Sequence, residues 1–394
     1  MAEQLIEPVV ARPSEYVHEG GSPMLVAVEA TRLLREVRGI GRYVRALLPR
    51  LVALRPGLSL VLYVKNRRDV QALEPAIAAL PALHDRVSIR PVREMTRSGA
   101  DVFWYPWNTA NPTPASGAVV TTIHDIVPIA HPDPRWRGWQ KNLRWRRRYA
   151  FTAKRATLIV ADSQFTADEI HRMLGVPHAR MRVALLAADD FAVPTAEHDG
   201  EVLARLGVHT PFVLVVGAAD RRKNLALLER AMPTVAAAHP GTTLVLAGPR
   251  RDAQPPGEHA SWRQTLGFVS DEELAALYRA AGVLVMPSTY EGFGLPVLEA
   301  MRLGTPVICA RGSSLPEVAG DAALWVDGED SASLAREIGR VLSDARVSAA
   351  LRSASLAQAS RFSWDETARL TISAFEEAIE MAGAAHGSAR RPSN

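Results

Sequence analysis

Short apolar runs alternate with amphipathic stretches along most of the chain. In the first half, runs rich in β-branched and aromatic residues predict strands at 24–30, 58–64, 86–92, 101–106, 118–125 and 156–163. Helical patterns separate several of these runs, and one of them extends to about Leu54. Because strands and helices alternate, the pattern predicts βα units and a parallel sheet, with functional loops at the carboxyl ends of the strands.

A second series of the same kind follows an irregular, proline-containing stretch. It predicts strands at 212–218, 242–248, 264–269, 283–288, 305–310 and 323–327, and helices at 224–238, 271–281, 296–303 and 331–343. Two successive sets of this type predict an α/β protein with two Rossmann-like, doubly wound domains.

The length of 394 residues also favours two domains, because it exceeds the number of residues that usually fold around one hydrophobic core. We expect a flexible leader at 1–22, an N-terminal domain at 23–190, a linker at 191–210, a C-terminal domain at 211–362, a helix at 363–382 and a disordered tail at 383–394. The helix at 363–382 either completes the second domain or crosses back onto the first.

Composition indicates a cytoplasmic protein. The one cysteine, Cys309, cannot form an intrachain disulfide, and its apolar surroundings predict a buried strand position. The chain has no apolar stretch long enough to span a membrane, and its first 22 residues lack the apolar run of a secretion signal. The net charge of +4 permits an anionic partner without demanding one.

The densest candidate site is PSTYEGFGLPVLEAMRLGTPV, at 287–307. Its glycines allow the backbone to approach a ligand closely, and Pro296 suits the first position of a helix. The amide N–H groups at that helix start would bind an anion such as a diphosphate. The loop residues expected at this ligand are Gly292, Phe293, Gly294 and Leu295.

Two glutamates flank this loop. Glu291 and Glu299 are eight residues apart, which on one continuous helix means about 12 Å along the axis, so they cannot form a carboxylate dyad. We therefore place Glu291 in the loop near a sugar, and Glu299 one turn into the helix, where it can accept hydrogen bonds from ribose hydroxyls. The alternative is a strand–turn–helix with two solvated glutamates.

A basic run, GAADRRKNL, lies between a predicted strand and the helix that follows it. Arg221, Arg222 and Lys223 stand at a sheet edge where α/β proteins bind ligands, and their charges would neutralise a departing phosphate. A solvated surface run is the alternative, although three cations oppose the dipole at a helix start.

The first half offers weaker candidates. His124 and Asp125 end the strand at 118–125, a position suited to a site, but a lone histidine is more often structural than catalytic. Gly39 and Gly41 are expected in a loop after the first strand; they lack the third glycine of a dinucleotide fingerprint, so a simple turn is an equal alternative.

The segment 135–155 contains nine Lys or Arg residues, three tryptophans and no Asp or Glu. As a helix it would place Arg137, Lys141, Arg144, Arg148 and Arg155 on one stripe, with Trp139, Leu143, Ala150 and Ala153 roughly opposite. This stripe is either a surface for an anionic membrane or a solvated face above a core-facing stripe.

Several of these pieces together resemble the retaining glycosyltransferases of family 4, which have the GT-B fold. The resemblance covers residues 26–367 in the family's order, through GIGRY, HDIVP, DSQFTADEI, VGAADRRKNL, GFVSDEELAALY, PSTYEGFGLPVLEAMRLGTPVI, SSLPEVAGDAALWVD and FSWDETA. It is strongest toward the bacterial mannosyltransferase- and rhamnosyltransferase-like members that build surface polysaccharides.

The resemblance implies roles for individual residues. Glu291 and Glu299 would be the E-x7-E pair, on the donor sugar and the ribose. Ala218 and Ala219 stand where many members have an arginine, so Arg221 and Arg222 both remain candidates, beside Lys223, for the diphosphate. The remaining implied contacts are His124 with the donor sugar, Gly39 and Gly41 with its phosphate, and the backbone near Val269 with the base.

The resemblance implies that the N-terminal domain at 23–190 binds the acceptor and the C-terminal domain at 211–362 binds the nucleotide-sugar donor. For the reaction, it implies transfer of a hexose with retention, from a nucleotide sugar held in a cleft between the two domains, without cofactor or metal. No two aspartates are spaced as D-x-D, so a common metal-binding signature is missing. We favour GDP-mannose as donor and a saccharide or polyprenyl-diphosphate-linked saccharide as acceptor, with a peripheral position on an anionic membrane.

Two other classes stay open from the residues alone. One is a nucleotide-sugar epimerase or a phosphorylase on the same architecture, although we identify no lysine for the pyridoxal phosphate of a phosphorylase. The other is a non-catalytic nucleotide-binding or nucleic-acid-binding module; we expect no nucleic acid partner, because the aromatic motifs of RNA-binding sheets are missing.

Overall fold

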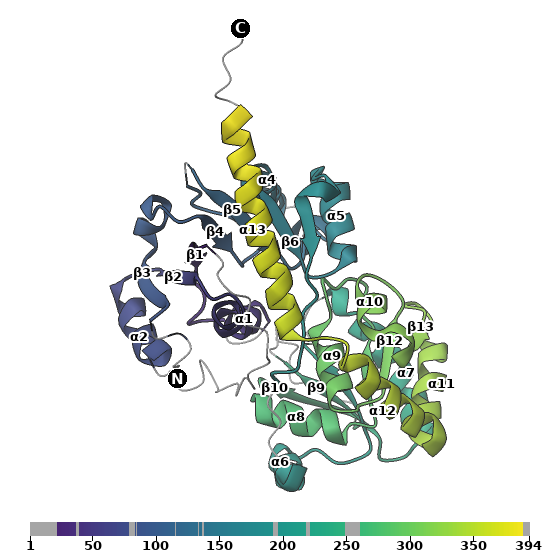
Figure 1. The fold of residues 1–394 in the computed structure, drawn as a ribbon. Helices are drawn as coiled ribbons and strands as arrows, with labels where there is room; N and C mark the ends of the chain where they lie inside the picture. Colours follow the sequence, from purple (N-terminus) through teal and green to yellow (C-terminus); the bar gives the residue numbers. More distant parts are fainter. Residues whose placement is uncertain are drawn as a thin grey trace. The chain divides into compact units, whose positions relative to one another are not determined.

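The fold consists of two compact units (Figure 1). The computed structural model describes residues 22–36, 39–78, 83, 85–114, 116–132, 134–135, 138–191, 196–217, 221–248 and 261–388. Unit 1 comprises the chain up to Leu186 together with the chain from Trp364 onward, and unit 2 is Ala187–Ser363. The leader expected at 1–22 lies outside the described residues except for Ser22.

Unit 1 is built on a seven-stranded sheet with the order β3-β2-β1-β4-β5-β6-β7, in which all neighbours are parallel. The strands are β1 (Met24–Glu29), β2 (Leu58–Val64), β3 (Val87–Pro91), β4 (Val102–Tyr105), β5 (Ala118–Ile123), β6 (Leu158–Ala161) and β7 (Met181–Val183). Six of them were predicted; β7 was not, because three residues carry too little apolar pattern. The chain reverses its direction of progress across the sheet between β1 and β4, which is the switch point of a doubly wound sheet.

Helices connect and cover the strands of unit 1. They are α1 (Ile40–Leu54), α2 (Arg67–Ala78), α3 (Val127–Ala130), α4 (Trp139–Arg155), α5 (Gln164–Leu174) and α13 (Trp364–Ser388). Every residue of β4, β5 and β6 is buried, as is typical of parallel strands covered on both faces.

Unit 2 repeats the arrangement with a six-stranded parallel sheet of order β10-β9-β8-β11-β12-β13. The strands are β8 (Phe212–Val216), β9 (Thr243–Ala247), β10 (Arg263–Gly267), β11 (Val283–Met286), β12 (Val307–Ala310) and β13 (Leu324–Val326). Cys309 lies buried in β12, as predicted. The predicted pair of Rossmann-like domains is thus confirmed.

The helices of unit 2 correct one expectation and add elements that were not predicted. They are α6 (Asp199–Leu206), α7 (Leu225–Ala238), α8 (Asp271–Ala280), α9 (Leu295–Arg302), α10 (Leu315–Ala319), α11 (Ser331–Ser343) and α12 (Ala345–Ala359). The linker expected at 191–210 contains α6, which an ion pair between Asp199 and Arg279 holds to α8. The long helix α12 was not predicted.

The last helix, α13, belongs to unit 1, which selects the second of the two places considered for it. Figure 1 shows it as the long yellow helix. Its fully buried Trp364 and Phe375 pack on Tyr43 and Trp104, with ring centroids 6.1 and 5.6 Å apart. It runs to Ser388, so the beginning of the tail expected to be disordered is helical; 389–394 lie outside the described residues.

In the part of the chain that the structure describes, no helix has both the length and the apolar character that crossing a bilayer requires.

Candidate functional site

Unit 2 gathers the strongest predicted residues at the carboxyl edge of its sheet. β8 and β11 are neighbours at the switch point, where the order of strands reverses and doubly wound proteins bind ligands. Arg221–Lys223 form a 3-10 turn after β8, and Glu291 lies in the loop after β11. The amide of Thr289 donates a hydrogen bond to the carbonyl of Arg222 (2.8 Å), which ties the two loops together.

A buried cluster of charges joins these loops. Lys223 Nζ donates to Glu291 Oε1 at 2.6 Å, and Arg222 Nη1 donates to Glu291 Oε2 at 2.8 Å. Arg222 Nη1 also donates to the carbonyl of Tyr290 at 2.9 Å. Lys223 and Glu291 are only 7% and 6% exposed. Each carboxylate oxygen of Glu291 therefore faces a cation.

This geometry keeps Glu291 ionised. Burial alone raises the pKa of Glu291, but the charges of Lys223 and Arg222 outweigh burial and hold that pKa below its usual value. Arg221 stands apart, since its side chain is exposed and makes none of the cluster's contacts. Of the two arginines left open by the sequence, Arg222 is the one that reaches the cluster.

The loop before α9 is shaped by a glycine and a buried serine. Gly294 caps the helix in the left-handed region (φ 104°), where residues other than glycine are strained. The Ser314 hydroxyl lies within hydrogen-bonding distance of the carbonyls of Glu291 (3.0 Å) and Phe293 (2.8 Å). Ser314, which the sequence argument missed, therefore fixes the course of the loop.

The helix begins one residue earlier than predicted, at Leu295, so Pro296 takes its second position. A helix start leaves backbone N–H groups without partners in the helix, which is the basis of anion binding there. Pro296 itself contributes no N–H group to such a site.

Glu299 lies in α9, and Glu291 lies in the loop before that helix. Glu299 Oε2 accepts a hydrogen bond from the Tyr278 hydroxyl of α8 at 2.9 Å, and both side chains are buried. The two glutamates are thus held by different groups, in agreement with the argument that they form no dyad. Tyr278 was missed because it is 21 positions away, on another helix.

The predicted base contact lies after β10. That strand ends at Gly267, two residues before the predicted end, so Val269 sits in the loop leading to α8. Val269 is buried, whereas the neighbouring Phe268 is exposed. Contact of this backbone with a base stays a prediction.

In unit 1, three neighbouring strands converge on His124. It follows β5, Asp162 follows β6 and Pro106 follows β4. His124 Nδ1 is 2.6 Å from Asp162 Oδ2, and Nε2 is 2.9 Å from the carbonyl oxygen of Pro106. A carbonyl only accepts, so Nε2 carries a hydrogen. Nδ1 then shares a second proton with Asp162, and the ring has no free lone pair with which to act as a base.

The pKa values of this pair agree with a held proton. Burial lowers the pKa of His124, but the charge and hydrogen bond of Asp162 and the Pro106 carbonyl raise it further, to a value above the usual one. Burial raises the pKa of Asp162 against the opposing effect of His124. Asp162 was missed, although it stands at a strand end like His124 and within the quoted DSQFTADEI.

One glycine prediction was wrong. Gly39 is the N-cap of α1 (φ 58°), but Gly41 lies inside the first turn of that helix and not in a loop. A Cβ at Gly41 would come within 1.6 Å of the carbonyl oxygen of Glu36, so close packing of the chain explains this glycine. Phosphate contact at either glycine stays a prediction.

The faces predicted for the basic helix also need correction. Of the expected core stripe only Ala153 is buried; Trp139 and Leu143 are 57% and 38% exposed, and Ala150 is exposed. Polar contacts set the rotation of the helix about its axis instead. The Tyr149 hydroxyl donates to the Asp125 carbonyl (3.1 Å), and Thr152 Oγ1 accepts from the Ala110 amide (3.0 Å). Arg137 lies outside the described residues.

Comparisons with known families cover both units. The family model described as "Glycosyltransferase Family 4" matches residues 37–189, and that described as "Glycosyl transferases group 1" matches residues 205–358. The chain is 32% identical over 377 residues to the O-antigen chain mannosyltransferase B of Escherichia coli, which covers 86% of this chain and 96% of that protein.

Solved structures share the fold. Sucrose-phosphate synthase from Thermosynechococcus elongatus superposes with a TM-score of 0.65 at 21% identity, over 91% of this chain and 99% of the other. Anabaena HepE, solved in complex with UDP and glucose, gives a TM-score of 0.65 at 17% identity, over 90% of this chain and 100% of the other.

Proposed function

We propose a mannosyl transfer reaction for this chain, which belongs to glycosyltransferase family 4 and is a glycosyltransferase of the GT-B fold. The donor is a nucleotide sugar, with GDP-mannose favoured. The acceptor is a saccharide, free or lipid-linked, of a cell-surface polysaccharide. The transfer retains the anomeric configuration and needs no metal ion.

The observation that carries this proposal is the buried cluster of Arg222, Lys223 and Glu291 at the switch point of unit 2. Two cations held after β8, beside the loop that follows β11, suit the diphosphate of a nucleotide sugar. In this structure the Glu291 carboxylate accepts hydrogen bonds from both cations. On donor binding, the diphosphate takes over part of this neutralisation, and Glu291 is released to contact the sugar.

The remaining donor contacts follow from the same loop. The N–H groups at the start of α9, beside Gly292 and Gly294, face the diphosphate and favour its negative charge. Glu299, oriented by the Tyr278 hydroxyl, accepts hydrogen bonds from the ribose. The backbone at Val269 meets the base.

In the transfer step, the bond between the anomeric carbon and the diphosphate oxygen breaks while an acceptor hydroxyl attacks from the same face. The electron pair of the broken bond leaves with the nucleoside diphosphate, and the hydroxyl proton passes to a phosphate oxygen of that leaving group. Lys223 and Arg222 stabilise the charge that develops there.

His124 contributes position and charge to this reaction. With Nε2–H directed at the Pro106 carbonyl and Nδ1 on Asp162, it cannot receive the acceptor's proton. We assign it a contact with the donor sugar, for which the Asp162 pair holds the ring in place.

Mannose is favoured because the E. coli relative that matches nearly the whole chain is named a mannosyltransferase. Uracil is the competing base, since the HepE structure contains UDP. The exposed cations of α4 support a peripheral position on the cytoplasmic face of an anionic membrane.

The test is a transfer assay on the purified chain. GDP-mannose, UDP-glucose, dTDP-rhamnose and an ADP-sugar are offered with mannose-containing oligosaccharides, and products are identified by mass and by the anomeric signals in NMR spectra. We expect turnover with GDP-mannose, an α-linked product from the α-linked donor, and no loss of rate in EDTA. A chain that turns over none of these donors and is not stabilised by any nucleotide contradicts the proposal.

Site variants sharpen the assay. Lys223→Ala, Arg222→Ala and Glu291→Ala are each expected to abolish turnover while the chain stays folded. Arg230→Ala, an exposed position on α7, is the matched control. Retained turnover in both Lys223→Ala and Glu291→Ala would show that the site is elsewhere.

A further inference from the structure

Three residues beside the candidate site have a backbone conformation that favours glycine. In the part of the chain that the structure describes, Asn108 (φ 67°), Asn224 (φ 51°) and Ser313 (φ 52°) are the residues other than glycine whose φ is positive. A side chain crowds the backbone in this left-handed region, so the conformation costs free energy and persists only where neighbouring contacts enforce it. Each of the three lies next to a residue that the proposed reaction uses.

Ser313 and its neighbour Ser314 hold both backbone polar groups of Glu291. Ser313 Oγ accepts a hydrogen bond from the Glu291 amide at 3.1 Å, and the Ser314 hydroxyl donates to the Glu291 carbonyl at 3.0 Å. The two serines follow β12, which pairs with β11, so they reach Glu291 from the neighbouring loop of the same sheet edge. In an extended chain consecutive side chains point to opposite faces, so the left-handed conformation of Ser313 lets both hydroxyls meet one residue.

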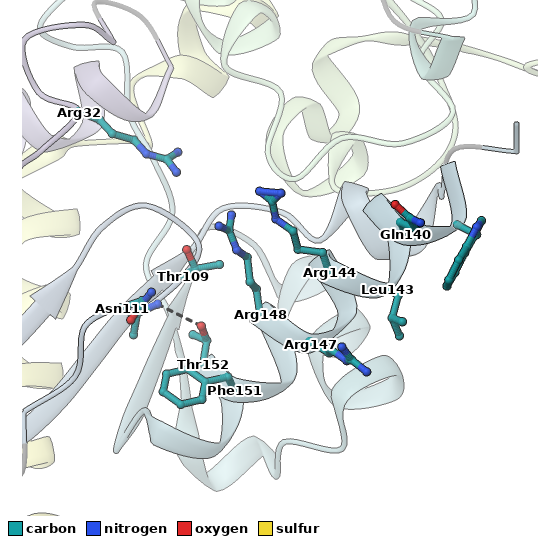
Figure 2. A pocket seen from close by; sticks show the side chains of 12 residues that line it. Arg32, Thr109, Asn111, Gln140, Leu143, Arg144, Arg147, Arg148, Phe151 and Thr152 are labelled. Atoms are coloured by element: carbon teal, nitrogen blue, oxygen red, sulfur yellow. Dashed lines mark hydrogen bonds between the residues drawn. The ribbon is translucent and has the colours of Figure 1, made fainter. Parts of the chain in front are cut away.

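Asn108 holds the backbone of His124 in unit 1 in a similar way. Its Oδ1 accepts a hydrogen bond from the His124 amide at 2.7 Å, and its own amide donates to the carbonyl of Thr122 at 3.0 Å. The loop of Asn108 is anchored to α4 as well, because the Ala110 amide donates to Thr152 Oγ1 at 3.0 Å. Figure 2 shows this bond in the wall of a cavity that both residues line. Bonds on either side of Asn108 therefore hold it in the left-handed conformation.

Asn224 completes the pattern. It directly follows Lys223, and its side-chain amide donates to the carbonyl of Gly328, in the loop after β13, at 2.8 Å. The loop that carries Arg222 and Lys223 is thereby fixed to a second loop of the same sheet edge. Asparagine adopts the left-handed conformation more readily than most residues, which leaves Ser313 as the least favourable of the three.

A turn alone does not account for Ser313. Glycine makes such a turn without strain, and glycines have a positive φ elsewhere in the same unit, at Gly207 (64°) and Gly241 (87°). Serine costs more in this conformation and adds one group that glycine lacks, a hydroxyl on the Glu291 amide. Strained residues of this kind cluster where the exact position of a functional group matters.

We propose that Ser313 and Asn108 are positioning residues for the transfer reaction. Each adopts a left-handed conformation that places a side-chain oxygen on a backbone amide, and so fixes Glu291 in unit 2 and His124 in unit 1. Each acts through the residue that it holds. The inference rests on the proposed transfer reaction, since that reaction gives Glu291 and His124 their roles.

Three replacements of Ser313 separate its hydroxyl from its backbone conformation. Ser313→Gly and Ser313→Ala remove the hydroxyl, whereas Ser313→Thr keeps it. In the transfer assay we expect kcat to fall about three- to tenfold in the first two, which is the loss of one hydrogen bond, and Ser313→Thr to retain more than about half of it. Melting temperatures should follow a different order, with Ser313→Gly above both other variants, because only glycine is unstrained there.

Gly241→Ala is the matched control for strain without a contact to the site. It places an alanine at φ 87° in the same unit, where its Cβ meets nothing within 4 Å. We expect it to melt at a lower temperature than the parent chain and to keep the parent kcat.

Asn108→Gly and Asn108→Asp repeat the comparison in unit 1. Both side chains suit the left-handed conformation, but only aspartate keeps an oxygen for the His124 amide. We expect kcat to fall about three- to tenfold in Asn108→Gly and less in Asn108→Asp. Equal kcat values in these two variants would remove the positioning role from Asn108.

Hydrogen exchange measures the positioning of Glu291 without turnover. In peptides that contain Glu291, amide exchange should become about threefold faster or more in Ser313→Gly and Ser313→Ala, and should stay as in the parent chain in Ser313→Thr and Gly241→Ala. Parent-like kcat or parent-like exchange in Ser313→Gly overturns the role of Ser313 and leaves the transferase standing. A kcat that follows the melting temperatures, with Ser313→Thr below Ser313→Gly, assigns Ser313 to stability alone and also overturns it. If exchange responds as expected but the parent chain turns over no donor, the transfer reaction fails and the hold of Ser313 on Glu291 stands.

Discussion

The contact between Lys223 and Glu291 offers the sharpest energetic test of the donor site. Replacing Lys223 with Met removes the cation 2.6 Å from Glu291 Oε1 in a place where both side chains are almost fully buried. Losing one partner of a buried ion pair costs about 3–5 kcal/mol. Arg222 remains on the other oxygen, so we expect about 2–3 kcal/mol for Lys223→Met.

The complementary change, Glu291→Gln, leaves two buried cations facing a neutral amide, and its expected cost is again about 2–3 kcal/mol. The double variant retains neither member of the pair. Its loss should therefore fall short of the sum of the single losses by about 1.5–3 kcal/mol, the coupling expected of side chains in one network. Calorimetric and urea unfolding of the full chain measures all three variants.

The pair of Arg340 and Glu337, 3.3 Å apart on α11 in the same unit and 54% and 26% exposed, is the control. Its cycle should give a coupling below about 1 kcal/mol. If the singles at Lys223 and Glu291 add to the double within about 0.5 kcal/mol, the two side chains are not coupled and the reasoning fails.

The dependence of stability on pH tests the same cluster independently. The pKa of Glu291 lies below its usual value of 4.5 in the folded chain, so its contribution to stability is complete above pH 4.5 and is lost as the pH falls through the lowered pKa. Glu291→Gln should remove that part of the acid sensitivity. A variant with the same loss of stability below pH 4.5 as the parent chain contradicts this.

Three further changes test the remaining groups. Asp162→Asn removes the counter-charge of His124 and should cost about 2–4 kcal/mol. Because the pKa of His124 is raised, its stabilisation is complete below pH 6.5 and is lost as the pH rises through the raised pKa. The variant should therefore show a flatter stability profile above pH 6.5, and equal profiles in variant and parent would refute the proton held between His124 and Asp162. Tyr278→Phe removes the hydroxyl that donates to buried Glu299, at a cost of about 1–3 kcal/mol, and should weaken nucleotide binding in calorimetric titration. Unchanged affinity would show that Glu299 does not bind the ribose. Gly294→Ala places a side chain at φ 104°, which should cost about 1–3 kcal/mol and raise the KM for the donor. A melting temperature and a KM like those of the parent chain would show that the loop tolerates the alanine.

The sequence predicted the two sheets because buried parallel strands leave a strong local signal. It also predicted that the loop of Lys223 and the loop of Glu291 follow strands, since each motif stands directly after an apolar run. The element α12 escaped because its sequence has little amphipathic contrast, and β7 because it is only three residues long. A strong local pattern thus explains the elements that were predicted, and a weak one explains why α12 and β7 were missed.

Pairings between distant residues were beyond reach for a different reason. The Asp162–His124 contact spans 38 positions and depends on β5 and β6 lying side by side, which tertiary structure alone decides. The face of α4 was mispredicted because hydrogen bonds of Tyr149 and Thr152 set its rotation, so that Trp139 stays exposed. Apolar periodicity cannot report such polar constraints.

The division of unit 1 into two stretches of chain affects the order in which the protein can fold during translation. Trp364 and Phe375, which fill its core against Tyr43 and Trp104, emerge from the ribosome only after all of Ala187–Ser363. At synthesis rates of about 5–20 residues per second, the earlier stretch waits on the order of ten seconds or longer for its last helix. The half made first is thus completed last, and a stop codon just before Trp364 would spare unit 2 while leaving a hole in unit 1.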